Sequence, residues 1–196
     1  MKKAILTLTF INFLTLAFAQ VQGLTDINGQ RLEKQRVSML ILGSWAVGNI
    51  ALGATLATRR EGEDKYFHAM NAGWNLVNLG LATAGYLSAV KADPAAFDLY
   101  ATINEQHKLQ QIFLFNAGLD VGYMMGGLYL MERSRRTENK PERLMGFGKS
   151  ILLQGAFLFV FDLGAFLWQS QGNGALQPLL EGLSFTGNSV GMAWRF

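Results

Sequence analysis

Four long stretches of apolar residues, separated by short charged connections, dominate the pattern of the chain. Each stretch approaches the roughly 20 residues that an α-helix needs to cross the hydrocarbon core of a bilayer. The strands of a membrane barrel would instead alternate apolar and polar residues over about ten positions. The pattern therefore predicts an all-α fold, a four-helix transmembrane bundle, with spans at residues 39–57, 69–90, 109–131 and 150–168.

Every one of these stretches also carries amide or carboxyl side chains near its middle. On the second stretch Asn71, Asn75 and Asn78 are three or four residues apart, which places them on one face of a helix. We expect the polar residues of the four helices to face one another in a seam inside the bundle. The candidate residues of this polar seam are Asn49, Asn71, Asn75, Asn78, Asn116, Asp120 and Asp162.

The Asn and Asp residues of the seam have different interpretations. Asn side chains form hydrogen bonds between membrane helices that contribute on the order of 1 kcal/mol each, so packing explains them. A carboxyl group at that depth is more costly, which makes Asp120 and Asp162 candidates for a functional role. Because no Lys or Arg lies at their depth, we expect one or both to be protonated at neutral pH.

Glycines recur in the first and third stretches in a similar order. Val47-Gly48 and Gly53 resemble Val121-Gly122 and Gly127, and Gly126 lies beside the latter. Such small residues let membrane helices approach closely. The matches are short, so an internal duplication of a two-helix unit and chance recurrence both stay open.

Residues 1–19 have the pattern of a secretory signal peptide. Lys2 and Lys3 supply the charged end, an apolar region follows, and Ala17 and Ala19 form a cleavage site before residue 20. The alternative is an uncleaved anchor. The predicted organisation is a signal peptide at 1–19, a polar segment with a turn at Asn28-Gly29 at 20–38, the transmembrane domain at 39–168 and a non-cytoplasmic tail at 169–196.

Lys and Arg are more numerous in the connections at 58–65 and 132–149 than in the segments on the other side. The positive-inside rule then places both termini outside the cytoplasm of a bacterial inner membrane. In the tail, Val190, Met192, Trp194 and Phe196 alternate like one face of a strand, which leaves the outer membrane as the alternative.

Composition removes several classes of function. The chain has no Cys, so disulfides and thiolate metal sites are excluded. The net charge of +3 is small and lies in loops, which argues against a nucleic-acid partner. His68 and His107 lie at opposite ends of neighbouring helices and cannot share a metal or haem. The short motifs of hydrolases, nucleotide-binding enzymes and metalloproteases are missing, so we predict no catalytic residues, metal or cofactor.

Three short motifs resemble those of a known family. NAGWN at 71–75, NAGLD at 116–120 and FGKS at 147–150 are similar to an uncharacterised bacterial family of small four-helix membrane proteins with a signal peptide, known as a domain of unknown function. The resemblance covers residues 31–168 and implies no catalytic residues.

The sequence therefore predicts a non-enzymatic structural or interaction component of the membrane. Its partners would be the lipid bilayer and either another membrane protein or further copies of itself. The alternative is a small transporter or a proton- or cation-conducting element that uses Asp120 and Asp162. A membrane-embedded enzyme is the third interpretation.

Overall fold

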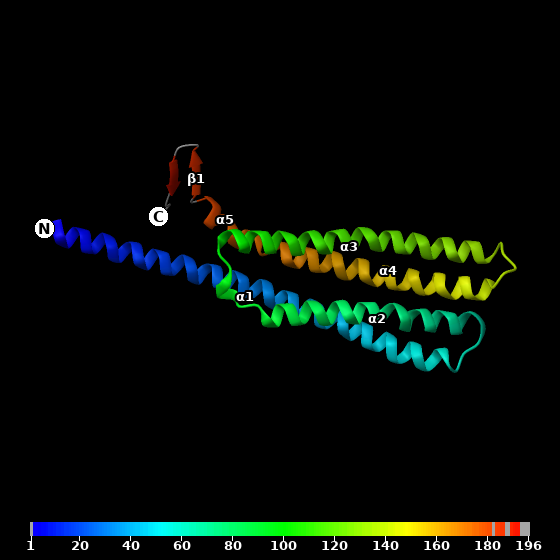
Figure 1. Ribbon diagram of the computed structural model, residues 1–196. Helices are drawn as coiled ribbons and strands as arrows, with labels where there is room; N and C mark the ends of the chain where they lie inside the picture. The colour runs from blue at the N-terminus through cyan, green and yellow to red at the C-terminus, as the bar shows by residue number, and fades with distance from the viewer. Residues whose placement is uncertain (1, 182, 187–188, 193–196) are drawn as a thin grey trace.

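Four long α-helices form the body of the protein in the computed structural model (Figure 1). The structure describes residues 2–181, 183–186 and 189–192, with side chains described for 22–177. The long helices are α1 (Lys2–Ala57), α2 (Gly62–Lys91), α3 (Leu99–Ser134) and α4 (Pro141–Ser170). Shorter elements are the 3-10 helix η1 (Pro94–Ala96), α5 (Asn173–Glu181), β1 (Leu183–Thr186) and β2 (Ser189–Met192).

The bundle consists of two helical hairpins. α1 packs along α2, and α3 packs along α4, while contact between α2 and α4 joins the two pairs (Figure 1). α1 meets α3 and α4 at only a few places. The predicted all-α, four-helix architecture is thereby confirmed.

α1 contains one correction to the sequence analysis. The turn predicted at Asn28-Gly29 is wrong, because α1 continues unbroken through both residues. Asn-Gly is a common turn signal, but here the Asn28 amide donates to Leu24 O at 2.9 Å and to Thr102 Oγ1 of α3 at 2.8 Å. The side chain is thus used inside the bundle, and the polar segment 20–38 continues directly into the first apolar stretch.

The N-terminal part of α1 and the β1–β2 hairpin lie at the same end of the bundle (Figure 1). The predicted signal peptide falls in the first turns of α1, which extend past the other helices (Figure 1), and its cleavage stays a prediction. In the tail, β1 and β2 pair antiparallel, with Leu183 opposite Met192. Val190 and Met192 lie in β2 as their alternation suggested, whereas Trp194 and Phe196 lie outside the described residues.

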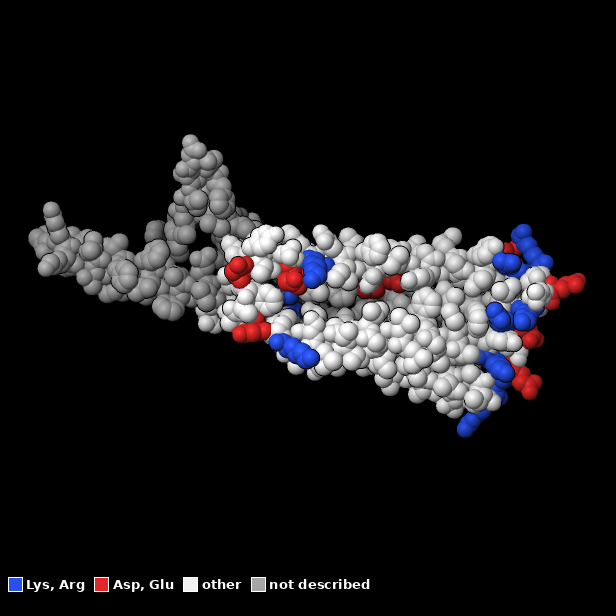
Figure 2. Space-filling model, in the orientation of Figure 1, with Lys and Arg blue, Asp and Glu red and all other residues white. Residues whose placement is uncertain are grey.

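Many polar side chains lie in the interior of the bundle beside a small apolar core of Leu42, Ala82 and Leu158, and large apolar side chains cover its outside. A soluble protein shows the opposite distribution. Leu52, Phe115 and Val160 are 66%, 67% and 70% exposed. Figure 2 shows charged side chains gathered at the two ends of the bundle and a largely uncharged band between them. The largest fully buried side chains are Gln154, Gln169, Asn28, Asn75, Thr102, Ser38 and Ser150.

Two helical stretches among the described residues are long and apolar enough to cross a membrane. They are Gln22–Ala57 and Pro141–Gln177. Only 22% and 33% of their most apolar windows are buried, so neither resembles the enclosed core helix of a soluble domain. The predicted spans at 69–90 and 109–131 lie in α2 and α3, whose Asn, Gly and Asp residues lower the hydropathy. Length and composition thus support two of the four predicted spans.

Candidate functional site: polar clusters inside the bundle

One cluster of hydrogen-bonded side chains links α1, α2 and α4. Gln154 Nε2 on α4 donates to Asn49 Oδ1 at 3.2 Å and to Asn71 Oδ1 at 3.0 Å. Trp45 Nε1 donates to Gln154 Oε1 at 2.9 Å, and Ser150 Oγ donates to Asn71 Oδ1 at 2.6 Å. These five residues are called the central amide cluster below. Because every side chain in it has a partner on another helix, the cluster holds three helices in one register.

The predicted polar face of α2 extends this cluster along the helix. Asn71, Asn75 and Asn78 are all buried, as their spacing predicted. Asn75 Nδ2 donates to Asn71 O at 2.8 Å, and Asn78 Nδ2 donates to Asn75 Oδ1 at 3.2 Å. The amides therefore satisfy one another inside the bundle instead of facing its outer surface.

The two aspartates of the predicted seam form a separate site. Asp120 on α3 and Asp162 on α4 are only 2% and 5% exposed, and their carboxyl groups lie next to each other. The Asn116 side chain lies beside Asp162. An ionised carboxylate only accepts hydrogen bonds, so a direct bond between the two carboxyl groups would need a proton on one of them.

One oxygen atom of the carboxyl pair has no hydrogen-bond partner among the described residues. Asp120 Oδ2 is buried and has no hydrogen-bond partner within the described part of the chain. None of the ion pairs found among the described residues involves Asp120 or Asp162. The seven predicted residues thus divide into four amides on α1 and α2 and a second group on α3 and α4, which consists of Asn116, Asp120 and Asp162.

Glycines bring α3 and α4 close enough for the carboxyl pair to form. A Cβ atom at Gly127 would lie 2.7 Å from the backbone oxygen of Gly148, and one at Gly155 would lie 3.1 Å from that of Asp120. In the other hairpin, Gly53 lies equally close to α2, since its Cβ would be 2.7 Å from His68 O. The other predicted packing positions, Gly48, Gly122 and Gly126, have open space beside them.

A second cluster at the other end of the bundle escaped the sequence analysis. Gln106 Nε2 donates to Gln169 O at 2.5 Å, and Gln110 Nε2 donates to Asn173 Oδ1 at 2.7 Å. Gln169 Nε2 in turn donates to Arg31 O at 3.4 Å. A signal was present, since Gln106 and Gln110 are four residues apart, as are Gln169 and Asn173. Gln110 lies at the very start of the third predicted span and the other three lie outside the spans, so none of them belongs to the polar middle of a span.

Arg31 closes this second cluster from α1. Its side chain is buried, donates to Asn28 Oδ1 at 3.0 Å and lies over the Phe97 ring at 4.8 Å from the centroid. Nearby, Lys34 Nζ donates to Trp168 O at 2.8 Å, near the end of α4. Cations near the C-terminal carbonyls of a helix are stabilised by the helix dipole. These two residues therefore fasten the end of α4 to α1.

Metal-binding side chains do not gather in the described residues. No group of three or more His, Asp or Glu side chains lies close enough there to hold a metal ion. Both His residues lie near the start of a helix, His68 on α2 and His107 on α3.

Comparison with known proteins places the chain in one family. Neither the curated proteins nor the solved structures contain a match to it. A family model does match, over residues 41–163, and this range includes all seven residues of the predicted seam. It covers most of the region for which the three motifs indicated an uncharacterised family, and that prediction is confirmed. The chain belongs to the family of unknown function DUF6992.

Proposed function

We propose that this protein is a polytopic membrane protein of the bacterial inner membrane, acting as a non-enzymatic structural or interaction component. The observation that carries the proposal is the distribution of side chains, with amides inside the bundle and large apolar residues outside it. In water, each Å² of apolar surface left exposed forgoes about 25 cal/mol of stabilisation. In lipid, exposure of that apolar surface carries no such free-energy cost. Hydrogen bonds between buried polar groups then contribute to specific packing of the helices.

The interior favours a packing role over a catalytic one. The central amide cluster is closed by its own hydrogen bonds, so it offers few free groups to a substrate. Two cavities lie at the ends of the bundle, one beside Arg31 and one beside Lys140. Neither is lined by the carboxyl pair or by the central amide cluster.

Membrane placement can be tested on the full chain by fractionation. We expect the protein to stay with the membrane after an alkaline carbonate wash and to need detergent for extraction. Recovery of the protein in the aqueous fraction without detergent would contradict the proposal.

Topology can be measured with single cysteines, because the chain has none of its own. We expect a membrane-impermeant maleimide to label Ala95→Cys, between α2 and α3, in intact cells with a permeable outer membrane. Glu61→Cys and Asn139→Cys, in the other two connections, should react only after the inner membrane is opened. The reverse pattern would contradict the proposed orientation with both termini outside.

A second candidate function is conduction of protons or small cations by the carboxyl pair. It is favoured by the burial of the two neighbouring carboxyl groups of Asp120 and Asp162 and by the unpartnered Oδ2 of Asp120. A carboxyl pair that can gain and lose a proton inside a bundle is a recurrent element of proton relays. The amides would then position α3 and α4 around it.

Reconstituted vesicles distinguish the two functions. Conduction predicts a proton or cation flux across the vesicle membrane. The double variant Asp120→Asn with Asp162→Asn should abolish this flux, since Asn keeps the shape of Asp but cannot take up or release a proton or carry a negative charge. Asp64→Asn, on the surface near the start of α2, is the control and should leave the flux unchanged. If the wild-type protein carries no flux above empty vesicles, conduction is excluded and the structural role stands.

A further inference from the structure

The connection between α3 and α4 forms a cavity with an unusual lining. It is open to the surface and has a volume of about 310 Å³, at the lower end of the range of small-ligand sites. Three of its side chains are cations and two are neutral hydrogen-bonding groups, and no carboxylate lines it. The lining residues are Arg133, Thr137, Asn139, Lys140, Arg143 and Leu144.

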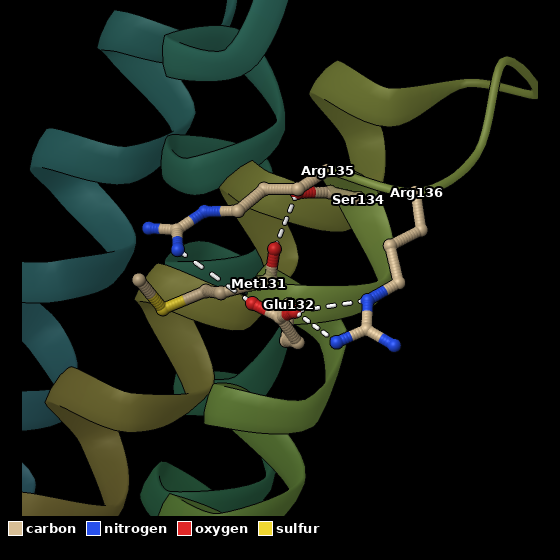
Figure 3. A network of polar contacts seen from close by, with 5 residues as sticks. All are labelled: Met131, Glu132, Ser134, Arg135 and Arg136. Carbon is tan, nitrogen blue, oxygen red and sulfur yellow. Dashed lines mark hydrogen bonds and ion pairs between the residues drawn. The ribbon is translucent and has the colours of Figure 1, made fainter.

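Two of the acids at this end of the bundle, Glu132 and Glu63, pair with other cations, whereas Glu138 and Glu142 lie next to lining residues in the sequence and form no ion pair within the described part of the chain. Figure 3 shows Glu132 between Arg135, at 3.6 Å, and Arg136, at 2.6 Å, two arginines that do not line the cavity. Glu63 on α2 pairs with Lys149. Throughout the described residues, no carboxylate forms an ion pair with Arg133, Lys140 or Arg143. Three cations without a carboxylate partner therefore share one cavity, and one of them, Arg143, lies over the Phe147 ring at 5.5 Å from its centroid.

The backbone beside the cavity adds further positive character. Lys140 has φ 53° and ψ 51°, the left-handed region, and precedes α4 without capping it. Pro141 has no N–H, and the first N–H groups of any helix lack partners within the helix. At the start of α3, by contrast, Asp98 accepts from Ala101 N at 2.7 Å. The positive end of the α4 dipole adds to the charge of the three side chains, and Glu142 in the first turn of α4 offsets part of it.

We propose that this cavity binds the phosphate group of an anionic phospholipid headgroup. Phosphate oxygens accept hydrogen bonds from Arg and Lys and carry the charge that the cavity lacks. The cavity lies at the end of α3 just past the uncharged band, which is the level of the headgroups in the membrane placement proposed above, on which the lipid source of the phosphate rests. Basic pockets on the cytoplasmic side of membrane helices are known to hold such headgroups.

Basic residues in cytoplasmic connections also serve topology, and that role needs no particular arrangement. The neighbouring connection between α1 and α2 offers the comparison. This connection and the first turn of α2 contribute Arg59, Arg60 and Lys65 at the same end of the bundle, and none of them lines the cavity. A general attraction to anionic lipid would treat the two sets of three cations alike, whereas a phosphate site would not.

The experiment compares two variants of the full chain with equal loss of charge. One replaces Arg133, Lys140 and Arg143 by Gln, and the control replaces Arg59, Arg60 and Lys65 by Gln. Each is purified in a mild detergent, and native mass spectrometry measures retained phosphatidylglycerol and, separately, phosphatidylcholine. We expect the cavity variant to retain at most about one tenth of the phosphatidylglycerol that the wild type retains. The control should retain an amount within about twofold of the wild type. Retention of phosphatidylcholine should be unchanged in both variants.

A second arm adds inorganic phosphate to the lipid-free protein. Phosphate binding that depends on the cavity cations, without preference for phosphatidylglycerol, would assign the site to free phosphate and overturn the lipid source. Equal lipid loss in both variants, or no loss in either, would overturn the site itself. If the cavity variant does not assemble, the pair Lys140→Gln with Arg143→Gln is compared with Arg59→Gln and Arg60→Gln. The carbonate wash tests membrane placement separately, so failure of the two proposals can be told apart.

Discussion

Gln154 shows how much a single side chain contributes to this bundle. It is fully buried and connects Trp45 and Asn49 on α1 with Asn71 on α2. An amide has both donors and acceptors, so it can serve several neighbours at once. Removing it leaves Trp45 Nε1 and Asn49 Oδ1 without their partner, while Asn71 Oδ1 keeps the bond from Ser150 Oγ.

We therefore expect Gln154→Leu to lower the free energy of unfolding by about 1–3 kcal/mol, the cost of unsatisfied buried groups. Gln111→Leu is the matched control, because Gln111 is exposed on α3. Denaturant titration in detergent, followed by Trp fluorescence, measures the difference. Equal stability of the two variants would show that the central amide cluster does not hold the helices.

For single residues, the sequence predicts burial inside the bundle better than it predicts which side chains form hydrogen bonds with each other. Spacing of three and four placed Asn71, Asn75 and Asn78 on one buried face. The partners of Asn71 could not be predicted, because they depend on the rotation and height of α4 relative to α2. Asn28 was misjudged since its role is set by Thr102, 74 residues further along the chain.

Among the helices, the α3–α4 interface depends on which glycine faces the partner. Gly126 and Gly127 are neighbours in sequence, yet only Gly127 lies against α4. The sequence marks both as small and does not distinguish them, because the distinction arises from a rotation of one residue about the helix axis. Gly53 and Gly127 occupy like positions in the two hairpins, which is compatible with a duplicated unit.

Substitution of these two neighbours makes a direct test. Gly127→Ala would place its Cβ 2.7 Å from Gly148 O, so the helices must separate. We expect a loss of about 1–3 kcal/mol of stability, typical of overpacking. Gly126→Ala, which meets open space, should be neutral or slightly stabilising because Ala favours helix. Thermal unfolding of both variants in one detergent gives the comparison.

The contact between α1 and α3 is limited to the end of the bundle. There Asn28 Nδ2 donates to Thr102 Oγ1, and Thr102 is completely buried. Thr102→Val keeps the shape but removes the acceptor, so we expect a loss on the order of 1 kcal/mol. Thr83→Val is the control, since that exposed hydroxyl bonds only to Leu79 O within α2. A larger loss for the control would contradict the role given to this contact.

For the molecule as a whole, the sequence predicts the number and type of elements and the inward polar face. Long apolar periodicity identified the four helices, and Pro141 lies at the start of the last one. The contact between α2 and α4 could not be predicted from the sequence. Short connections determine only that consecutive helices lie side by side, and α2 and α4 are not consecutive. Membrane insertion remains a proposal, supported by two apolar helices and by the outer surface.

The outer surface makes its own prediction. Val160 is 70% exposed in the uncharged band, whereas Tyr100 is 79% exposed near the start of α3. In the proposed membrane placement, Val160→Lys puts a charge in lipid at a cost of about 2.5–3.5 kcal/mol, and Tyr100→Lys does not. We expect less membrane-inserted protein for Val160→Lys in quantitative fractionation. In an aqueous protein both surface changes would be nearly neutral, so equal levels would argue against lipid contact.

The pairing of α1 with α2 and of α3 with α4 also bears on how the chain is made. Most contacts lie within a hairpin, so neighbours in sequence find each other before distant segments must. The first hairpin leaves the ribosome complete while the second is still being translated, and it exposes the Asn-rich face of α2 until α4 arrives. For that interval, a chaperone or a neighbouring chain could occupy the amides that Ser150 and Gln154 later cover.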